Sequence, residues 1–454
     1  MTRFKFAASV VLVGIALFAV GFANWGSAQK RCPADREVVV FWHFWGGEDL
    51  NVVQDVVRRF NESQTKYWVR EIAMPGNNLQ AKLFLSISGN EPPDLVNQDD
   101  PILADWSERN LLTPFDDFCP SDELERLEPW LVPAAKGLSQ YNGRFMALCN
   151  GLDVRTLFVN NTYLAKRSHS MPSNWDEFNQ TIEAISPADG NRNRELYAFL
   201  PDSRRLWAWA TVFGGGISVK DNAVTLATPQ NVEALAWMQS FGNRYGADSL
   251  AAYRNADQSL PGKMFPLLPS TIDRDVGRYV FLMDGQWRIR DLERFNRERT
   301  DSGREPIDFR AVPLPHPNFG RENAGWINGN FFVVPRGAKN KPGAWEFMKF
   351  WIGFGHENEA AITCSQGGWI PVSQHVVEAR RYQEYLHEHE LMKTFVDLAA
   401  SRNQFPYPVT PGADRLQRSV NQAVFEVMNH PELKAETVLE ELEQRTQAQR
   451  EARQ

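Results

Sequence analysis

The 454-residue chain has little cysteine, and what it has is not spaced for metal or redox chemistry. Its four cysteines are Cys32, Cys119, Cys149 and Cys364, with no CxxC pair, which argues against a zinc or thiol-exchange site. In an exported chain one disulfide is reasonable, and Cys119 and Cys149 are the nearest pair along the sequence. Lys30 and Arg31 precede Cys32, where a lipoprotein signal has small and apolar residues, so a lipid anchor is not expected.

The chain also lacks an excess of positive charge and the common catalytic motifs. Its 49 Lys and Arg against 56 Asp and Glu give a net charge of −7, which disfavours nucleic-acid binding. HExxH, GxSxG and Walker-type sequences are absent, so we assign no catalytic residue, metal ligand or cofactor. His387 and His389 lie two apart on an expected helix and diverge, which predicts a solvated face rather than a metal site.

Long apolar runs are confined to the N-terminus. Arg3 and Lys5 precede an unbroken apolar run over residues 7–23, and small residues follow at 26–28. This pattern is typical of a secretory signal, so residues 1–28 are predicted to be a signal peptide that is removed before Gln29. The run is close to membrane-spanning length, which leaves an uncleaved inner-membrane anchor as the alternative. Either way, the rest of the chain is expected to be exported to the periplasm.

The chain does have the composition and length of a large soluble protein. Apolar residues make up 43% and charged residues 23%, as in globular domains, and the length favours two lobes. Fifteen tryptophans suggest a surface that stacks against flat apolar faces.

Strand and helix patterns alternate from residue 38 onward. A Val-rich strand at 38–42 is followed by a helix with its stripe at Val53, Val56, Val57 and Phe60. Strands at 67–73 and 92–99 follow, separated by a helix over residues 77–88. This order predicts a mainly parallel, doubly wound sheet, with ligands outside the carboxyl ends of its strands. Those ends are 42–47 and 97–100.

Later segments continue the alternation of predicted strands and helices. Residues 143–167 predict strand, polar break, strand and helix, and strands are expected at 279–287, 309–313 and 324–334. The polar residues 439–454 are expected to fray. The absence of a long linker suggests that the chain crosses between two lobes several times.

Several segments, taken in order, resemble extracellular solute-binding proteins of the maltose-binding-like sugar class. They include "FWHFWGGED", "SGNEPPDLVNQD", "FLMDGQW" and "GGWIPVS", and the resemblance covers roughly residues 37–430. It implies a type II periplasmic binding-protein fold, with two α/β lobes that close on a sugar, joined by a multi-strand hinge. The implied bounds are 36–153 and 327–360 for lobe 1, and 154–326 and 361–454 for lobe 2.

The resemblance also implies the function and part of the site. Such a protein would be the carbohydrate-binding component of an ABC importer, acting as a monomer and passing its sugar to a membrane permease. The positions that match ligand contacts in the family are His43, Trp45, Gln98, Asp99, Asp153, Arg155, Trp287 and Trp369. This chain has Cys149 where the family commonly has proline, so the resemblance does not predict the backbone conformation at this position.

Sequence patterns, apart from the resemblance, add further candidate ligand contacts, and each candidate could also have a purely structural role. Trp207 and Trp209 cannot share one helical face, so one of them is expected to face the cleft. Trp326 and Asn328 lie where a strand is expected to cross the hinge. Each position also has a structural interpretation. His43 and Trp45 could plug a sheet end, and Asp153 with Arg155 could form a structural ion pair.

Two other functions fit the same residues. Asp99 and Asp153 could serve a secreted glycoside hydrolase, whose chemistry needs paired carboxylates in an aromatic cleft. Arg155 or Arg288 could instead hold the phosphate of a ligand such as a glycerol phosphate.

Overall fold

The computed structural model describes residues 32–74, 78–99, 101–191, 194–258, 260 and 264–452. The predicted signal peptide at 1–28 and Asp100 lie outside the described residues. Within the described ranges, no helix is long and apolar enough to cross a membrane.

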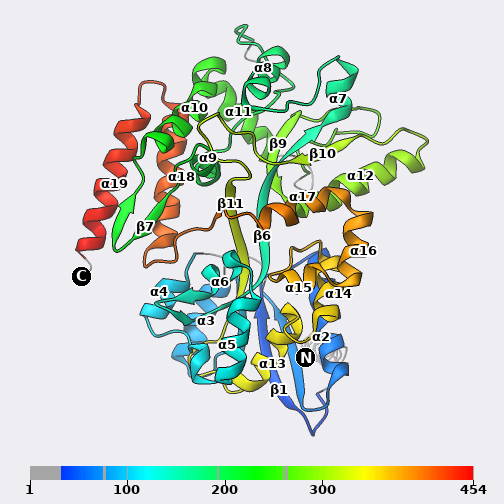
Figure 1. The fold of residues 1–454 in the computed structure, drawn as a ribbon, viewed down its shortest axis with the longest axis vertical. Helices are drawn as coiled ribbons and strands as arrows, with labels where there is room; N and C mark the ends of the chain where they lie inside the picture. Colours follow the sequence, from blue (N-terminus) through cyan, green and yellow to red (C-terminus); the bar gives the residue numbers. More distant parts are fainter. Residues whose placement is uncertain are drawn as a thin grey trace, which may run out of the picture.

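The chain folds into two α/β lobes that lie one above the other in Figure 1, with the long strands β6 (Leu148–Asn160) and β11 (Gly325–Val333) passing between them. The lower, first lobe begins with β1 (Glu37–His43), α2 (Glu48–Ser63), β2 (Tyr67–Ala73), α3 (Leu79–Ser88), β3 (Leu95–Gln98), α4 (Leu103–Glu108), η1 (Phe115–Asp117), α5 (Ser121–Trp130), α6 (Pro133–Ser139), β4 (Gln140–Tyr141) and β5 (Arg144–Phe145). It is completed by α13 (Lys341–Ile352), α14 (Glu357–Gly367) and α15 (Gln374–Val377).

The upper, second lobe holds the middle of the chain and its end. Its first part consists of α7 (Asn161–Lys166), α8 (Trp175–Ile185), η2 (Ser203–Arg205), α9 (Leu206–Val212), β7 (Ser218–Lys220), β8 (Ala223–Thr225), α10 (Pro229–Tyr245), α11 (Ala247–Gln258), β9 (Phe281–Gly285), η4 (Gln286–Arg288), α12 (Ile289–Asp301) and β10 (Phe309–Val312). The chain returns to it through α16 (Arg380–Glu388), and ends with α17 (Glu390–Ala399), β12 (Gln404–Phe405), α18 (Ala413–Asn429) and α19 (Ala435–Glu451).

One mixed sheet runs through both lobes, in the order β10-β6-β11-β3-β1-β2, with β9 also paired to β6 and β12 to β11. The two-lobed α/β class is thus confirmed. The parallel prediction holds for β1, which is parallel to β2 and β3. It is wrong around β6, which is antiparallel to β9, β10 and β11. The reason is the connectivity: β6 carries the chain into the second lobe and β11 brings it back.

Strand β6 also corrects the expected polar break. It is one continuous strand of 13 residues, and Asn150 and Gly151 lie inside it. Both are buried, so the polar pair does not end the strand. The strand is long because it must reach from the first lobe to the second.

The first lobe is built as the periodicity predicts. The stripe Val53, Val56, Val57 and Phe60 of α2 is buried. The side chain of Asn61, at the end of this stripe, accepts a hydrogen bond from the Val69 amide and donates one to the Val69 carbonyl. This amide pair fixes α2 against β2.

The C-terminal segment and the cysteines differ from expectation. Helix α19 continues to Glu451 and buries Leu439 and Leu442, so the predicted fraying of this segment is wrong. All four cysteines are free thiols, and the suggested Cys119–Cys149 bridge does not form. The thiol of Cys149 instead lies 3.6 Å from the carbonyl oxygen of Gly151 within its own strand.

Candidate functional site

Four predicted site residues lie together on one face of the two crossing strands. Asn328 of β11 is directly opposite Asp153 of β6, and the next pair inward is Ile327 with Val154. Directly opposite residues share a face and alternate residues return to it, so Arg155 and Trp326 lie on the same face as Asp153 and Asn328. We call these four side chains the hinge face.

The guanidinium of Arg155 contacts two indole rings. Its Cζ is 4.5 Å from the ring centroid of Trp287 and 4.5 Å from that of Trp326. Arg155 is buried, with 7% of its surface exposed, whereas Trp287 is half-buried. Burial, and then the nearby charge of Arg205, lower the pKa of Arg155 to about 10. It remains a cation at neutral pH and makes cation–π contacts with both rings.

A glycine two residues earlier lets Trp287 take this position. A Cβ on Gly285 would lie 2.2 Å from the Trp287 ring, so the indole folds back over its own backbone. The same arrangement recurs at Gly367, where a Cβ would lie 2.5 Å from the ring of Trp369. In both places the missing side chain of the glycine leaves room for the indole two residues later. The Gly-x-Trp pattern alone does not predict this, because at Gly343-Ala344-Trp345 a Cβ would meet Val39, Asn340 and Tyr67 instead of the indole.

Asp153 is held by Gln286, a residue that was not predicted as part of the site. Nε2 of Gln286 donates to Oδ1 of Asp153 and to the Leu152 carbonyl, both at 2.9 Å, while its Oε1 accepts from the Val154 amide at 3.3 Å. Burial raises the pKa of Asp153, against the opposing effects of Arg155 and Gln286. Asp153 is therefore positioned by η4.

The row of rings continues past the hinge face into the second lobe. Tyr407 packs against Trp326 with ring centroids 4.8 Å apart, and Trp207 packs edge-on against Tyr407 at 4.5 Å. Trp207 and Tyr407 line a cavity of about 600 Å³, which Gly137 of the first lobe also borders. Trp207 thus faces a cavity that residues of both lobes line.

Trp209 lies elsewhere. It is fully buried, and its ring packs against Trp175, Phe199 and Trp237, with centroids 4.6–6.3 Å apart. The structure thus separates the two tryptophans. Trp209 lies in the core of the second lobe, where it also borders the cavity of about 690 Å³ that Arg205 and Arg288 line.

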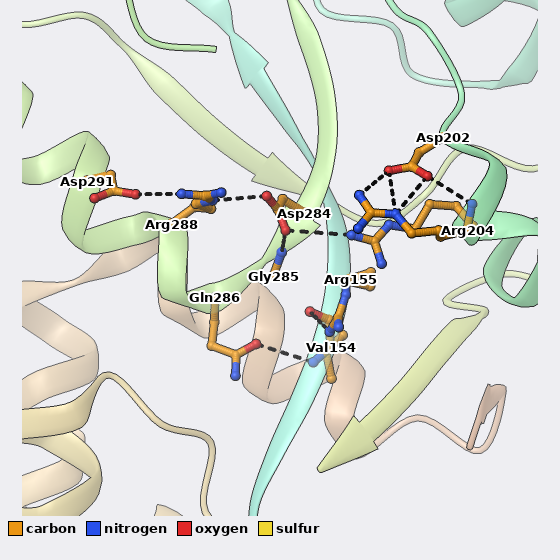
Figure 2. Close-up of polar contacts among 10 residues, drawn as sticks. Val154, Arg155, Asp202, Arg204, Asp284, Gly285, Gln286, Arg288 and Asp291 are labelled. Atoms are coloured by element: carbon orange, nitrogen blue, oxygen red, sulfur yellow. Dashed lines mark hydrogen bonds and ion pairs between the residues drawn. The ribbon is translucent and has the colours of Figure 1, made fainter. Parts of the chain in front are cut away.

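Charged side chains gather beside Arg155, and most of them carried no sequence signal. Asp202 pairs with Arg204, and Arg288 lies between Asp284, at 3.0 Å, and Asp291, at 3.1 Å (Figure 2). Arg205 completes the set, and we call Asp202, Arg204, Arg205, Asp284 and Arg288 the charged group. Burial opposes the ionisation of Asp202, but the hydrogen bonds and charge of Arg204 outweigh it and lower the pKa of Asp202 to about 2. Of this group, only Arg288 was predicted from the sequence as a candidate ligand contact.

The residues at the end of β1 face the helices of the first lobe. His43 is fully buried, and its Nε2 lies 3.4 Å from Oε2 of Glu71 on β2. Trp45, 6% exposed, forms a near-parallel cluster with Trp351 and Trp369, with centroids 5.3–5.7 Å apart. Trp369 alone of these three indoles is half-buried. His43 and Trp45 are therefore enclosed by the first lobe, and Trp369 is the indole of this cluster that is partly accessible.

The residues at the end of β3 divide in the same way. Gln98 is buried and pairs with Phe331 of β11, whereas Asp99 is exposed. The Asp99 carbonyl accepts a hydrogen bond from Nδ2 of Asn328 at 3.3 Å. This contact brings Asp99 to the hinge face, and Gln98 lies within the sheet.

The structure thus brings Asp99, Asp153, Arg155, Trp287, Trp326 and Asn328 into one neighbourhood. Such a surface combines flat aromatic rings with carboxylate, amide and guanidinium groups, which suits a ligand with both apolar faces and hydroxyl groups.

The sequence has the same family signature along most of its length. Residues 55–389, more than half of the chain, match the model of a bacterial extracellular solute-binding protein. The chain belongs to this family of bacterial extracellular solute-binding proteins.

Individual relatives are similar at low identity over most of their length. The maltotriose-binding protein of Pyrococcus abyssi (strain GE5 / Orsay) is 22% identical over 355 residues, which cover 77% of this chain and 69% of that protein. Two solved structures share the fold. The sugar-binding protein MalE from Xanthomonas citri has a TM-score of 0.71 at 17% identity, covering 92% of this chain and 98% of that one. The cyclic alpha-maltosyl-1,6-maltose binding protein from Arthrobacter globiformis has a TM-score of 0.70 at 18% identity, covering 92% and 100%.

Proposed function

We propose that the protein is the carbohydrate-binding component of an ABC importer, exported to the periplasm by residues 1–28. It binds an oligosaccharide between its lobes as a monomer and delivers it to a membrane permease. The observation that carries this proposal is the half-buried indole of Trp287 beside Asp153 and Asn328, since sugar recognition needs an apolar platform next to planar hydrogen-bonding groups. The names of the relatives, which bind maltotriose and a cyclic maltosyl-maltose, support the same ligand class.

In this proposal the ligand contacts are Trp287, Trp369, Asp153, Asn328 and Asp99. Trp207 extends the site along its cavity, and Arg155 and Trp326 hold Trp287 in place. His43, Trp45 and Gln98 act through the packing beneath the surface. Closing two lobes around a bound ligand is the motion that such folds commonly use.

Isothermal titration calorimetry with neutral mono- and oligosaccharides tests this function. We expect saturable binding of at least one oligosaccharide, with one molecule per chain, and a rise in melting temperature at high ligand concentration. If no carbohydrate binds or raises the melting temperature, the proposed function is wrong.

The same samples test binding without catalysis. We expect each oligosaccharide to be recovered unchanged after incubation. Turnover that disappears in Asp153→Ala would establish the glycoside hydrolase instead.

Ion pairs that join the two lobes support the proposed closure and predict a salt effect. Nη2 of Arg290 on α12 lies 2.7 Å from Oδ1 of Asp49 on α2, and Nη1 of Arg294 lies 3.2 Å from Oε1 of Glu48. These side chains are 29–66% exposed, so each pair contributes about 0.2–1 kcal/mol. Changing both arginines to glutamate is expected to weaken ligand affinity about three- to tenfold at low salt, with a smaller effect at high salt.

The control for this prediction is Arg58→Glu on α2, the helix that carries Asp49 and Glu48. Among the described residues, the ion pairs of Arg58 stay within that helix, with Asp55 and Glu62. The charge reversal Glu48→Arg with Asp49→Arg should restore affinity in the double-glutamate variant. Equal affinities for all variants at low salt would show that these pairs do not stabilise the closed form.

A further inference from the structure

A cavity of about 690 Å³ in the second lobe is lined by arginines and aspartates. Its charged lining residues are Asp202, Arg204, Arg205, Arg254, Asp257, Asp284 and Arg288. The cavity therefore contains the whole charged group, next to the hinge face. Four guanidinium groups and three carboxylates share it, so its charges depend on how these groups pair.

Most of the carboxylates are already engaged by arginines other than Arg205. Asp202 pairs with Arg204, and Asp257 pairs with Arg278. Asp284 lies 3.0 Å from Nε of Arg288 but 3.9 Å from Nη2 of Arg205, which is too long for a hydrogen bond.

Arg205 and Arg155 are two buried cations that share their nearest carboxylates with other groups. Asp284 forms a close ion pair with Arg288 and only a longer one with Arg205. The charges of Asp153 and Asp284 act on Arg155, against the repulsion from Arg205.

The Cζ atoms of Arg205 and Arg155 lie 5.7 Å and 4.5 Å from the ring of the same residue, Trp326. The side chain of Arg205 is 13% exposed and Arg155 is 7% exposed. Within the described part of the chain, Nε of Arg155 and Nε of Arg205 have no acceptor. Both residues thus carry a charge and a hydrogen-bond donor whose burial is costly.

Cation–π contact offsets part of the cost of burying the charge, but an aromatic ring provides no strong acceptor for the N–H groups. A carboxylate or phosphate oxygen provides both negative charge and acceptor lone pairs, and the guanidinium fork matches its geometry. A hydroxyl group, by contrast, leaves the repulsion between the two guanidinium groups in place.

We propose that the ligand is an acidic saccharide, carrying a carboxylate or a phosphate ester, and that Arg205, which lines this cavity, binds its anionic group at the cavity mouth. The positive charge of the neighbouring Arg155, which packs on Trp287 and Trp326, favours an anion at the same place. The inference rests on the proposed function and names its ligand class. Trp287 then contacts the sugar ring, while Arg205 selects for the charge.

A competing explanation is that the two arginines only brace the second lobe against Trp326. That role would make them matter for folding but not for ligand choice. The two roles differ in one observable, the ratio of affinities for acidic and neutral saccharides.

The test measures dissociation constants by calorimetry for wild-type protein and for Arg205→Gln. The probes are oligomers of galacturonic, glucuronic and mannuronic acid, neutral gluco- and manno-oligosaccharides of the same lengths, glucose 6-phosphate and glycerol 3-phosphate. We expect an acidic saccharide to bind wild-type protein at least tenfold more tightly than its neutral counterpart. Arg205→Gln should weaken that ligand about ten- to a hundredfold, as the loss of charge-assisted hydrogen bonds predicts, while neutral ligands change less than threefold.

The matched control is Arg310→Gln, which changes the net charge equally in the same lobe. Arg310 lies on β10, pairs with Asp308 just before that strand, and is 51% exposed. It should leave every affinity unchanged. Retained binding of a neutral saccharide by Arg205→Gln, or an unchanged melting temperature, shows that this variant folds.

The outcomes separate the inference from the proposed function. Uronic-acid oligomers and glucose 6-phosphate distinguish a carboxylate from a phosphate ester as the group that is held. If neutral saccharides bind as well as acidic ones, or if Arg205→Gln weakens both classes equally, the acidic-ligand inference is wrong and the sugar-binding function stands. If glycerol 3-phosphate alone binds, or nothing binds, both are wrong.

Discussion

Trp287→Ala is expected to weaken saccharide binding about ten- to a hundredfold, which corresponds to roughly 1–3 kcal/mol of lost aromatic contact. The half-buried ring has one face against Arg155, so alanine removes the platform and also uncovers the guanidinium. Calorimetry on the folded variant measures the loss, and the melting temperature without ligand should change little.

Trp68→Ala provides the matched control. Trp68 on β2 is also half-buried and also has an arginine over its ring, with Cζ of Arg36 5.6 Å from the ring centroid. It lies in the first lobe, away from the hinge face, and its loss should leave affinity unchanged. Equal effects of the two substitutions would show that Trp287 has no specific contact with the ligand.

The second large effect is on stability. Trp209→Ala is expected to lower the free energy of unfolding by about 3–5 kcal/mol, the usual cost of truncating a fully buried large aromatic residue. The ring is enclosed by Trp175, Phe199 and Trp237, which cannot all collapse into the space it leaves. Urea denaturation, at a temperature where the variant is folded, measures the change.

Trp209→Ala also separates packing from binding. At a temperature where the variant is folded, its affinity for neutral saccharides should be close to that of the wild type, because Trp209 borders the cavity of the charged group and not the hinge face. A variant as stable as the wild type that loses binding would place Trp209 in contact with the ligand and contradict its assignment to the core.

The order of elements could be predicted from the sequence because their periodicity is local. The stripe of α2 and the strands β1, β2 and β11 follow directly from their side-chain patterns. The direction of β6 relative to its neighbours could not be predicted in this way. Strand pairing is long-range, and β6 pairs with β9, β10 and β11, whose positions along the chain carry no such information.

The site was predictable where the pattern fixed the face of a strand. Asp153 and Arg155 alternate along β6, so their shared face followed once the strand was assigned. For His43 and Trp45, strand alternation predicted that both side chains lie on the same face of the chain. It did not predict whether that face points to the cleft or to the helices of the first lobe. That orientation depends on α13, whose Trp351 covers Trp45 from about 300 positions further along the sequence.

The sequence contains no periodic pattern that would have predicted the charged group. Asp202, Arg204 and Arg205 lie in and beside a single 3-10 turn, where neither helical nor strand periodicity applies. Their partners Asp284 and Arg288 come from a different strand and turn. Only the fold brings these segments together.

The central claim is that a saccharide binds against the hinge face, between the lobes. A crystal structure of the protein with its tightest-binding oligosaccharide tests this most directly. The account predicts a sugar ring in van der Waals contact with the indole of Trp287, about 4 Å away, and hydroxyl groups hydrogen-bonded to Asp153 and Asn328. A saccharide bound elsewhere, with Trp287 and Asp153 free of it, would contradict the account.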